Sequence, residues 1–527
     1  MRKVSAVLSL CAIALCLHGE DIASRIVRVK GVTDAVCSVT NAALLKRSAD
    51  GKSVDPLAMW TAIQDDGGAK CADAFVRVDF ILSPESGSDI RCRAELPLPD
   101  KWNGRLWGKG NSGYAGALPS LSDLMASGSA AVTTDLGTWK ITDFGRNNSK
   151  VWPANVQRDF NWRATHLMTV YGKRIVAAFY GKLCDKAYFI GGSTGGRQAM
   201  SEAIRFPEDY DGIIAALPDN SASVNEIAVW HLWRQTHDAD GRTIFTTNEM
   251  RVVSDAAVAY RAKSDPAPYA GRFLADARFP ERDVDGFLAL AAERCPTLAM
   301  GNKIQRLKAL YMPLMHGGAC YFNGFAPGSY LGKNMQWMGI VNLRSYLMAH
   351  GISPAKWKDI GMEDIDGFLM EYAPEFNACS PDLSAFAKRG GKLIMSAGWE
   401  DQTIPPAPII DYYERVCERD GCIGKTKEYF RLFCVPGCAH GGGKGRTITG
   451  APGGERVRKQ LIDWCEKGTP PETIDASYDG WRKKMPVAAY PDLCVLDANG
   501  RWIQRDMPRG VVQIDGRCLE TKCKVER

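Results

Sequence analysis

Short apolar runs alternate with amphipathic stretches from about Phe75 to Leu217. One run ends at Leu106 and Trp107, and another ends near Asp135. In "ATHLMTVYGKRIVAAFYG" the apolar residues recur every three or four positions, which predicts a helix with one buried face. Strands that alternate with such helices are typical of a parallel sheet covered by helices. The pattern therefore predicts an α/β fold for this part of the chain.

The pattern changes from about Asp219 to Ala385, where helix-like stretches and proline breaks replace most strand-like runs. Strand patterns resume in "GGKLIMSAGWEDQTIPP" and "YFRLFCVPGCAHGGG". A sheet that brackets the changed segment predicts an inserted, mainly helical domain. The tail after about Thr469 has no pattern that we can assign. The predicted organisation is a signal peptide at 1–19, a sheet domain at 25–218 and 386–475, an inserted domain at 219–385 and a C-terminal extension at 476–527.

The chain begins with "MRKVSAVLSLCAIALCLHGED", in which two basic residues precede an apolar run and a polar switch. This pattern is typical of a signal peptide, and the run is too short to span a bilayer. We expect a secreted or periplasmic protein with no membrane partner. The formal net charge is +6 for 527 residues, with basic and acidic residues interleaved, so no nucleic-acid partner is indicated.

Seventeen cysteines are present, and two of them, Cys11 and Cys16, fall in the predicted signal peptide. The remaining number is odd, so at least one thiol stays free. Zinc is the alternative to disulfides, but no Cys-x2-Cys has a matching second pair. The spacing suits disulfides in an exported protein. The candidate pairs are Cys417 with Cys422, Cys518 with Cys523, and Cys295 with Cys320.

A candidate nucleophile, Ser193, stands in "FIGGSTGGRQAM" between two glycine pairs. The strand-like residues 187–190 precede it, and a helix-like stretch begins at Gly196. A serine on a tight strand-to-helix turn is the arrangement of a nucleophile elbow, and the alternative is a structural glycine turn. A phosphate loop is not indicated, because Gly-x4-Gly-Lys-Ser/Thr is missing.

A serine nucleophile needs a base and an orienting acid, which in such a fold follow it in the order acid, then histidine. Asp401 follows the predicted strand 392–396, and His440 follows the predicted strand 429–435. Glu400 is an alternative acid, and Asp411 is interpreted as a solvated helix residue. The remaining histidines lie in the signal peptide or in helix-like or inserted segments and are interpreted as structural: His18, His166, His231, His237, His316 and His350.

An oxyanion hole would need two backbone N–H groups. The first is predicted to come from Thr194, directly after the nucleophile. The second is expected from the early glycine-rich loop "GKGNSGYAG", with Gly113 preferred and Ser112 second.

Taken together, "GGSTGGRQA", "KLIMSAGWEDQTIPP" and "RLFCVPGCAHGGG" resemble the tannase and feruloyl esterase family, as do "GKGNSGYAG" and "VTTDLG". The resemblance covers roughly residues 35 to 475. It implies an α/β-hydrolase sheet with a large, mainly helical lid domain inserted after the nucleophile elbow. It also implies a serine esterase in which Ser193 is the nucleophile, Asp401 the acid and His440 the base.

Two departures from the family pattern stand out. Many members have a cysteine before the serine and another after the histidine, joined in a disulfide, whereas this chain has Gly192 and Gly441. The resemblance therefore implies that packing and hydrogen bonds alone hold the two loops. Many members also carry a calcium loop with several aspartates, and the matching region here has only Asp265 and Asp276. Calcium prefers six to eight oxygen ligands, so two aspartates do not indicate a calcium site. We expect no calcium and no other cofactor.

The expected substrate is a small aromatic ester or a plant polysaccharide or polyphenol ester. Feruloyl esters come first, galloyl esters second and terephthalate monoesters third. The substrate-binding residues cannot be assigned from the sequence. Trp230, Trp233, Trp337 and Trp399 are candidates for contacting the substrate ring, with core packing as the alternative. A serine peptidase and a non-catalytic carbohydrate-binding protein are the rival interpretations.

Overall fold

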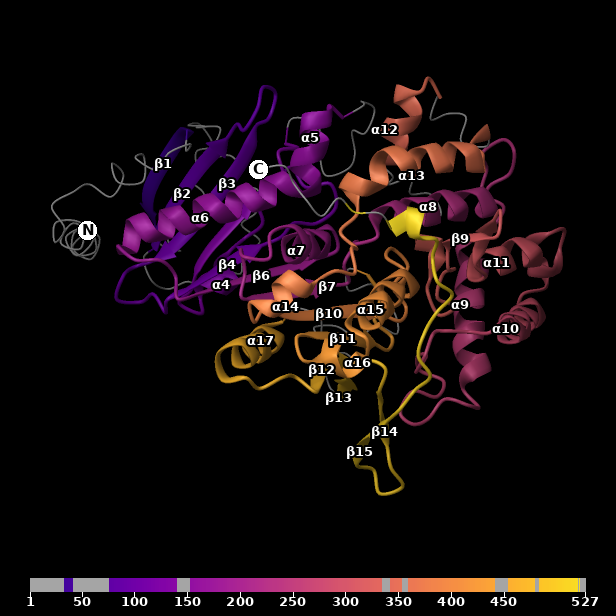
Figure 1. The fold of residues 1–527 in the computed structure, drawn as a ribbon. Helices are drawn as coiled ribbons and strands as arrows, with labels where there is room; N and C mark the ends of the chain where they lie inside the picture. The colour runs from indigo at the N-terminus through magenta and orange to yellow at the C-terminus, as the bar shows by residue number, and fades with distance from the viewer. Residues whose placement is uncertain are drawn as a thin grey trace, which may run out of the picture. The chain divides into compact units, whose positions relative to one another are not determined.

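The computed structural model describes residues 33–40, 75–139, 152–333, 342–352, 359–440, 454–478, 483–519 and 521 (Figure 1). The chain forms two compact units. The first comprises 1–190 and 208–211, and the second comprises 191–207 and 212–527. The predicted signal peptide lies outside the described residues, and the predicted domain boundaries stay a prediction. None of the helices in the described ranges has the length and apolar character to cross a membrane.

The first unit contains a mixed sheet whose strands follow the order β1-β2-β3-β5-β4-β6. The pairs β1–β2, β2–β3 and β3–β5 are antiparallel, and β4 runs parallel to both β5 and β6. The strands are β1 (Thr33–Thr40), β2 (Phe75–Leu82), β3 (Ile90–Pro97), β4 (Arg105–Lys109), β5 (Ala130–Thr134) and β6 (Lys186–Gly192). The helical segments are α4 (Ser122–Met125), α5 (Ala154–Arg158), a π-helical turn (Asp159–Arg163) and α6 (Ala164–Tyr180).

The predicted strand near Asp135 and the helix after it are confirmed as β5 and α6. Every residue of β5 is buried, as expected for a strand covered on both faces. Helix α6 packs on β5 at Gly172, where a Cβ atom would lie 3.1 Å from the Val132 side chain. The helix ends at Gly181, whose φ of 74° is the left-handed conformation common at helix C-termini.

The second unit contains three parallel strands that lie side by side in the order β7-β10-β11 (Figure 1). All residues of β11 are buried, and α17 packs on β7 and β10. A strand that is buried on both faces has a continuous apolar run in its sequence. For this reason the sequence pattern could predict these strands. The elements are α7 (Thr194–Arg205), β7 (Gly212–Ala216), α14 (Ser384–Lys388), β10 (Lys392–Gly398), α15 (Pro406–Asp420), α16 (Ile423–Lys427), β11 (Phe430–Val435) and α17 (Glu455–Lys467).

The segment between β7 and β10 is mainly helical, as the sequence pattern predicted for 219–385, and its role as a lid domain stays a prediction. One short hairpin, β8–β9, interrupts the helices. Helix α9 begins with a reciprocal capping box between Thr246 and Glu249. The elements are α8 (Ala222–Thr236), α9 (Thr247–Arg261), α10 (Glu281–Arg294), a 3-10 turn (Pro296–Ala299), α11 (Lys303–Tyr311), β8 (Leu314–His316), β9 (Ala319–Phe322), a 3-10 turn (Leu331–Lys333), α12 (Asn342–Ala349) and α13 (Met362–Phe376).

The C-terminal tail has structure that the sequence pattern did not predict. It forms two antiparallel pairs, β12 (Thr473–Tyr478) with β13 (Lys483–Ala488) and β14 (Leu493–Leu496) with β15 (Trp502–Arg505), followed by a 3-10 turn (Gly516–Leu519). The N–H of Tyr490 donates to the carbonyl of Leu432 at 2.7 Å, so the tail bonds to strand β11.

The predicted disulfides are not formed in the structure. Cys295, Cys320, Cys417 and Cys422 are all free thiols. Cys417 is buried on α15, whereas Cys422 is exposed, so the two side chains occupy different environments despite their short spacing. Cys518 is also a free thiol, and Cys523 lies outside the described residues.

Candidate functional site

Ser193 occupies a strained turn between β6 and α7. Its φ of 59° and ψ of −124° are unusual for a residue with a side chain. A Cβ atom on Gly191 would lie 2.2 Å from the carbonyl oxygen of Gly195, so the turn needs glycine there. Strain of this kind is stored at functional sites more often than elsewhere. The helix begins at Thr194, two residues earlier than predicted.

The end of β7 holds the serine backbone on both sides. The N–H of Ser193 donates to the carbonyl of Ala216 at 3.0 Å, and the N–H of Asp219 donates to the carbonyl of Ser193 at 3.1 Å. Gly196 allows close packing here, because a Cβ atom on it would lie 2.6 Å from the Cα of Pro218. The orientation of the Ser193 side chain is therefore set by its own turn and by the neighbouring strand.

The three residues predicted for a triad lie together in the second unit. His440 Nδ1 lies 2.8 Å from Asp401 Oδ2, and His440 Nε2 lies 3.1 Å from Ser193 Oγ. Asp401 is fully buried, and the His440 side chain is 18% exposed. With the ring proton on Nδ1, Nε2 can accept the serine hydroxyl proton. The arrangement can perform general-base-assisted nucleophilic attack.

The two carboxylate oxygens of Asp401 have different hydrogen-bond partners. Oδ2 faces the imidazole, while Oδ1 accepts hydrogen bonds from the N–H groups of Thr403 and Ile404, both at 2.8 Å. These two backbone hydrogen bonds hold the carboxylate in its orientation beside the imidazole. The carboxylate that contacts the imidazole is thus Asp401, and not the alternative Glu400.

The interpretation of Asp411 as a solvated helix residue was wrong. It lies on α15 as predicted, but its side chain is fully buried. The carboxylate accepts hydrogen bonds from Arg415 Nε at 2.8 Å and from the N–H of Ile514 at 3.3 Å. The Ile514 contact comes from the C-terminal tail, which the sequence pattern left unassigned.

Sequence reasoning missed Gln402, whose side chain contacts the backbone of His440. Its amide oxygen accepts from the His440 N–H at 3.2 Å, and its amide nitrogen donates to the His440 carbonyl at 3.4 Å. Nothing in "GWEDQTIPP" marks this glutamine, because the contact joins residues 38 positions apart.

A second missed residue is Asp219, which follows β7. Burial raises the pKa of its carboxyl group to about 6, against the lowering effects of Arg197, His440 and a hydrogen bond from Asn225. The charge on Asp401 raises the pKa further. Asp219 thus places another ionisable group in the electrostatic environment of the imidazole.

The two predicted oxyanion donors fall in different units. Thr194 is buried at the N-terminus of α7, where the helix dipole favours negative charge. Gly113 has a φ of 53° in the loop after β4, close to Ser112, whose carbonyl accepts from Ala115. The roles of Thr194 and Gly113 remain predictions.

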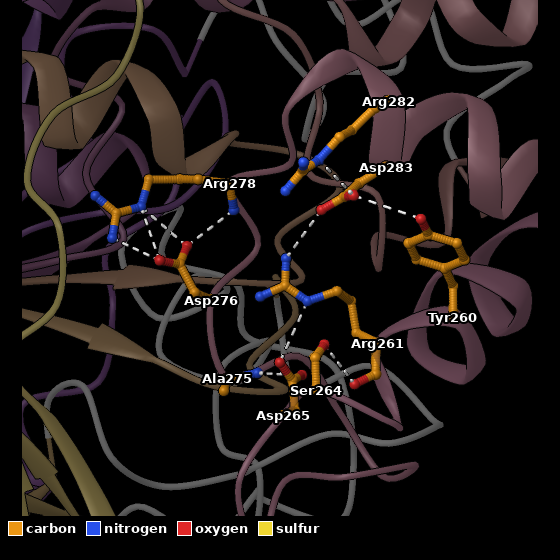
Figure 2. Close-up of polar contacts among 9 residues, drawn as sticks. All are labelled: Tyr260, Arg261, Ser264, Asp265, Ala275, Asp276, Arg278, Arg282 and Asp283. Carbon is orange, nitrogen blue, oxygen red and sulfur yellow. Dashed lines mark hydrogen bonds and ion pairs between the residues drawn. The ribbon is translucent and has the colours of Figure 1, made fainter.

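The lid region expected to match a calcium loop is built from ion pairs (Figure 2). Asp265 accepts from Arg261 Nε at 3.3 Å and from the N–H of Ala275 at 3.2 Å. Arg278 Nε donates to Asp276 Oδ1 at 2.9 Å and to Oδ2 at 3.1 Å, and a terminal nitrogen of Arg278 donates to Oδ2 at 2.6 Å. Guanidinium groups therefore face both carboxylates that a cation would need, and the donor set does not fit calcium.

The candidate tryptophans lie in different settings. Trp230 is fully buried, and Trp233 stacks on His237 with ring centroids 4.7 Å apart, so both contribute to packing within the lid. Trp399 lines a cavity of about 230 Å³ together with Phe279 and other apolar residues, and none of the three triad residues lines that cavity. Trp337 lies outside the described residues.

Comparisons with known proteins agree with one another. The tannase and feruloyl esterase family matches residues 76–267 and 344–505. Feruloyl esterase B of Aspergillus niger is 29% identical over 413 residues, covering 72% of this chain and 75% of that protein. A probable feruloyl esterase B-2 of Aspergillus flavus is 28% identical over 446 residues, covering 77% of this chain and 82% of that protein.

Solved structures share the fold. Feruloyl esterase B from Aspergillus oryzae has a TM-score of 0.74 at 21% identity, over 92% of this chain and all of that one. Tannin acyl hydrolase from Aspergillus niger has a TM-score of 0.68 at 18% identity, over 93% of each chain. The predicted α/β-hydrolase fold is thereby confirmed. Because the family match spans more than half of its residues, the chain belongs to the tannase and feruloyl esterase family of carboxylic ester hydrolases.

Proposed function

We propose that this protein hydrolyses esters of aromatic carboxylic acids, with feruloyl and related hydroxycinnamoyl esters as the first class of substrate. The observation that carries the proposal is the continuous contact from Asp401 through His440 to Ser193, on a strained turn of an esterase-family chain. Relatives whose names include feruloyl esterase B favour the feruloyl class.

The proposed reaction is a two-step acyl transfer. His440 Nε2 takes the proton of Ser193 Oγ while the oxygen attacks the ester carbonyl. The oxyanion accepts a hydrogen bond from the N–H of Thr194, and the alcohol leaves with the proton that His440 returns. Water then attacks the acyl-enzyme by the same route and releases the acid. Asp401 holds the imidazole in the tautomer that accepts the serine proton.

Galloyl esters are the second candidate class, because a structure named tannin acyl hydrolase shares the fold. Terephthalate monoesters are the third. A peptidase using the same triad and a non-catalytic carbohydrate-binding protein are the rival functions. Only a catalytic role requires the short contact between His440 Nε2 and Ser193 Oγ, which favours an enzyme.

The decisive experiment compares hydrolysis of methyl ferulate, methyl gallate, a terephthalate monoester and a chromogenic peptide by the wild type and by Ser193→Ala. We expect the highest kcat/KM on methyl ferulate. Loss of Ser193 Oγ is expected to lower kcat by about 10⁴-fold or more. Hydrolysis of the peptide alone, or activity that survives in Ser193→Ala, would contradict the proposal.

The proposed enzyme works outside the cytoplasm and without calcium. Export rests on the apolar N-terminal run, which lies outside the described residues. Calcium independence is supported by the ion pairs in which Arg261 and Arg278 face Asp265 and Asp276.

A further inference from the structure

The turn that carries the acid bonds repeatedly to the segment that carries the histidine. This turn, residues 399–402, follows β10 and is here named the acid turn. The N–H of Trp399 donates to the carbonyl of Val435 at 3.0 Å, and the N–H of Glu400 donates to the carbonyl of Cys438 at 3.1 Å. The backbone contact between the parallel strands β10 and β11 thus continues beyond the ends of both strands.

The next two residues of the acid turn both contact His440. Asp401 contacts the ring, and Gln402 contacts the backbone through a donor and an acceptor of the same amide group. The Gln402 side chain is buried, with the residue 4% exposed. Because an amide is planar and holds its donor and acceptor side by side, this pair of bonds constrains the peptide groups on both sides of the His440 Cα.

The chain has no covalent alternative at this place. Gly192 and Gly441, next to the serine and the histidine, carry no thiol. In the part of the chain that the structure describes, the cysteines of the histidine segment are free thiols, so non-covalent contacts align this segment with Ser193.

We propose that Gln402 is a positioning residue for His440, which keeps the imidazole Nε2 within hydrogen-bond distance of Ser193 Oγ. This proposal rests on the proposed esterase function. Asp401 fixes the rotation of the His440 ring, while Gln402 fixes the position of the His440 backbone. Both constraints are needed, because a displacement of about 1 Å in a reacting group can lower a rate about 100-fold.

The test replaces the amide without changing the length of the side chain. Gln402→Met removes both hydrogen bonds, and Gln402→Glu keeps an acceptor for the His440 N–H but loses the donor. We expect Gln402→Met to lower kcat by about 10- to 100-fold with KM within about twofold. Gln402→Glu should lie between Gln402→Met and the wild type. Circular dichroism and thermal melting establish that each variant is folded.

The matched control is Gln460→Met on α17. Gln460 also bonds a backbone carbonyl, that of Thr473 at 2.8 Å, but it belongs to no part of the site. We expect this control to keep kcat within about twofold. A Gln402→Met enzyme with wild-type kcat, or one whose kcat falls no more than that of the control, would overturn the proposal.

A substrate-independent assay separates this proposal from the choice of ester. A 4-nitrophenyl phosphonate reacts once with an activated serine: the Ser193 Oγ–P bond forms, the bond from P to 4-nitrophenolate breaks, and the serine proton passes to His440. We expect the rate of 4-nitrophenolate release to fall in Gln402→Met by the same factor as kcat/KM. If the wild type reacts but hydrolyses no aromatic ester, the proposed function fails while the role of Gln402 is still measured. An equal rate in Gln402→Met, or no reaction in the wild type, would refute the positioning role.

A double variant distinguishes positioning from general destabilisation. Asp401→Asn already removes the correct orientation of the imidazole, so adding Gln402→Met should cost much less than it does in the wild type. Multiplicative losses would show that Gln402 acts independently of His440 and would contradict the proposal.

Discussion

Asp135, at the end of β5, is a carboxyl group whose charge can be removed with little change in shape. It is fully buried, and its Oδ1 accepts hydrogen bonds from the N–H groups of Arg91 at 3.0 Å and Gly137 at 2.8 Å. Oδ2 is buried without a hydrogen-bond partner among the described residues. Burial raises the pKa of this carboxyl group to about 7, although both N–H donors act in the opposite direction.

The magnitude follows from proton linkage. A folded-state pKa near 7 against an ordinary value of 3.8 means that the folded chain holds a proton that the unfolded chain has lost. The stabilisation present below about pH 4 is therefore lost as the pH rises to about 7. At about 1.4 kcal/mol per pH unit, the loss totals about 4 kcal/mol.

The substitution Asp135→Asn keeps an acceptor at Oδ1 and removes this pH dependence. Its new amide nitrogen would be a buried donor without a partner, which costs about 1–3 kcal/mol. The variant should therefore be destabilised by about 1–3 kcal/mol at pH 5. Relative to the wild type, it should gain about 3 kcal/mol between pH 5 and pH 8.

The assay is urea unfolding of both proteins at pH 5, 6, 7 and 8, followed by tryptophan fluorescence. Asp100→Asn, a substitution at an exposed site in the same unit, is the control for the loss of one charge. A difference in unfolding free energy between wild type and Asp135→Asn that stays constant across this range would refute the reasoning.

Three further predictions concern the second unit. Asp401→Asn should lower kcat by about 10⁴-fold in ester assays, because the imidazole loses the acceptor that sets its tautomer; a loss below about tenfold would contradict this role. Chelation by EDTA should leave Tm unchanged, and a fall in Tm would instead indicate a bound cation. Arg278→Met should destabilise the protein by about 2 kcal/mol or more in urea unfolding, because Asp276 then keeps a largely buried charge without its partner. The raised pKa of Asp219 makes the wild type lose stability between about pH 4 and pH 6. The stability of Asp219→Asn relative to the wild type should therefore rise over that window and stay constant above it. Parallel curves of unfolding free energy against pH for the two proteins would argue against this.

The positions of the candidate triad could be predicted because each residue follows a buried parallel strand. A strand buried on both faces is a short apolar run, and it is visible without knowledge of its neighbours. Ser193, Asp401 and His440 each stand directly after such a run or its turn, and the structure brings their side chains together. Their catalytic roles stay proposals until the variants are measured.

Contacts over long sequence distances could not be predicted in this way. The strands β12 to β15 are short and partly exposed, so their apolar pattern is weak. The sequence pattern predicted that Asp411 is a surface residue, because its partner Ile514 lies 103 positions away and could not be recognised. Sequence reasoning judged two aspartates too few for calcium, but it did not anticipate that Arg261 and Arg278 would pair with them.

The acid turn illustrates why local sequence can locate a candidate site and still miss the residue that we propose aligns it. The chemistry requires a carboxylate beside a histidine, so Asp401 can be inferred from the type of residue and its place after a strand. Alignment requires only hydrogen-bonding groups at the right distance, and almost any polar residue can supply those. Gln402 is therefore silent in the sequence and becomes recognisable only when its amide is seen against the backbone of His440. The proposed role of Gln402 therefore depends on one buried amide whose hydrogen bonds join the acid turn to the backbone of His440.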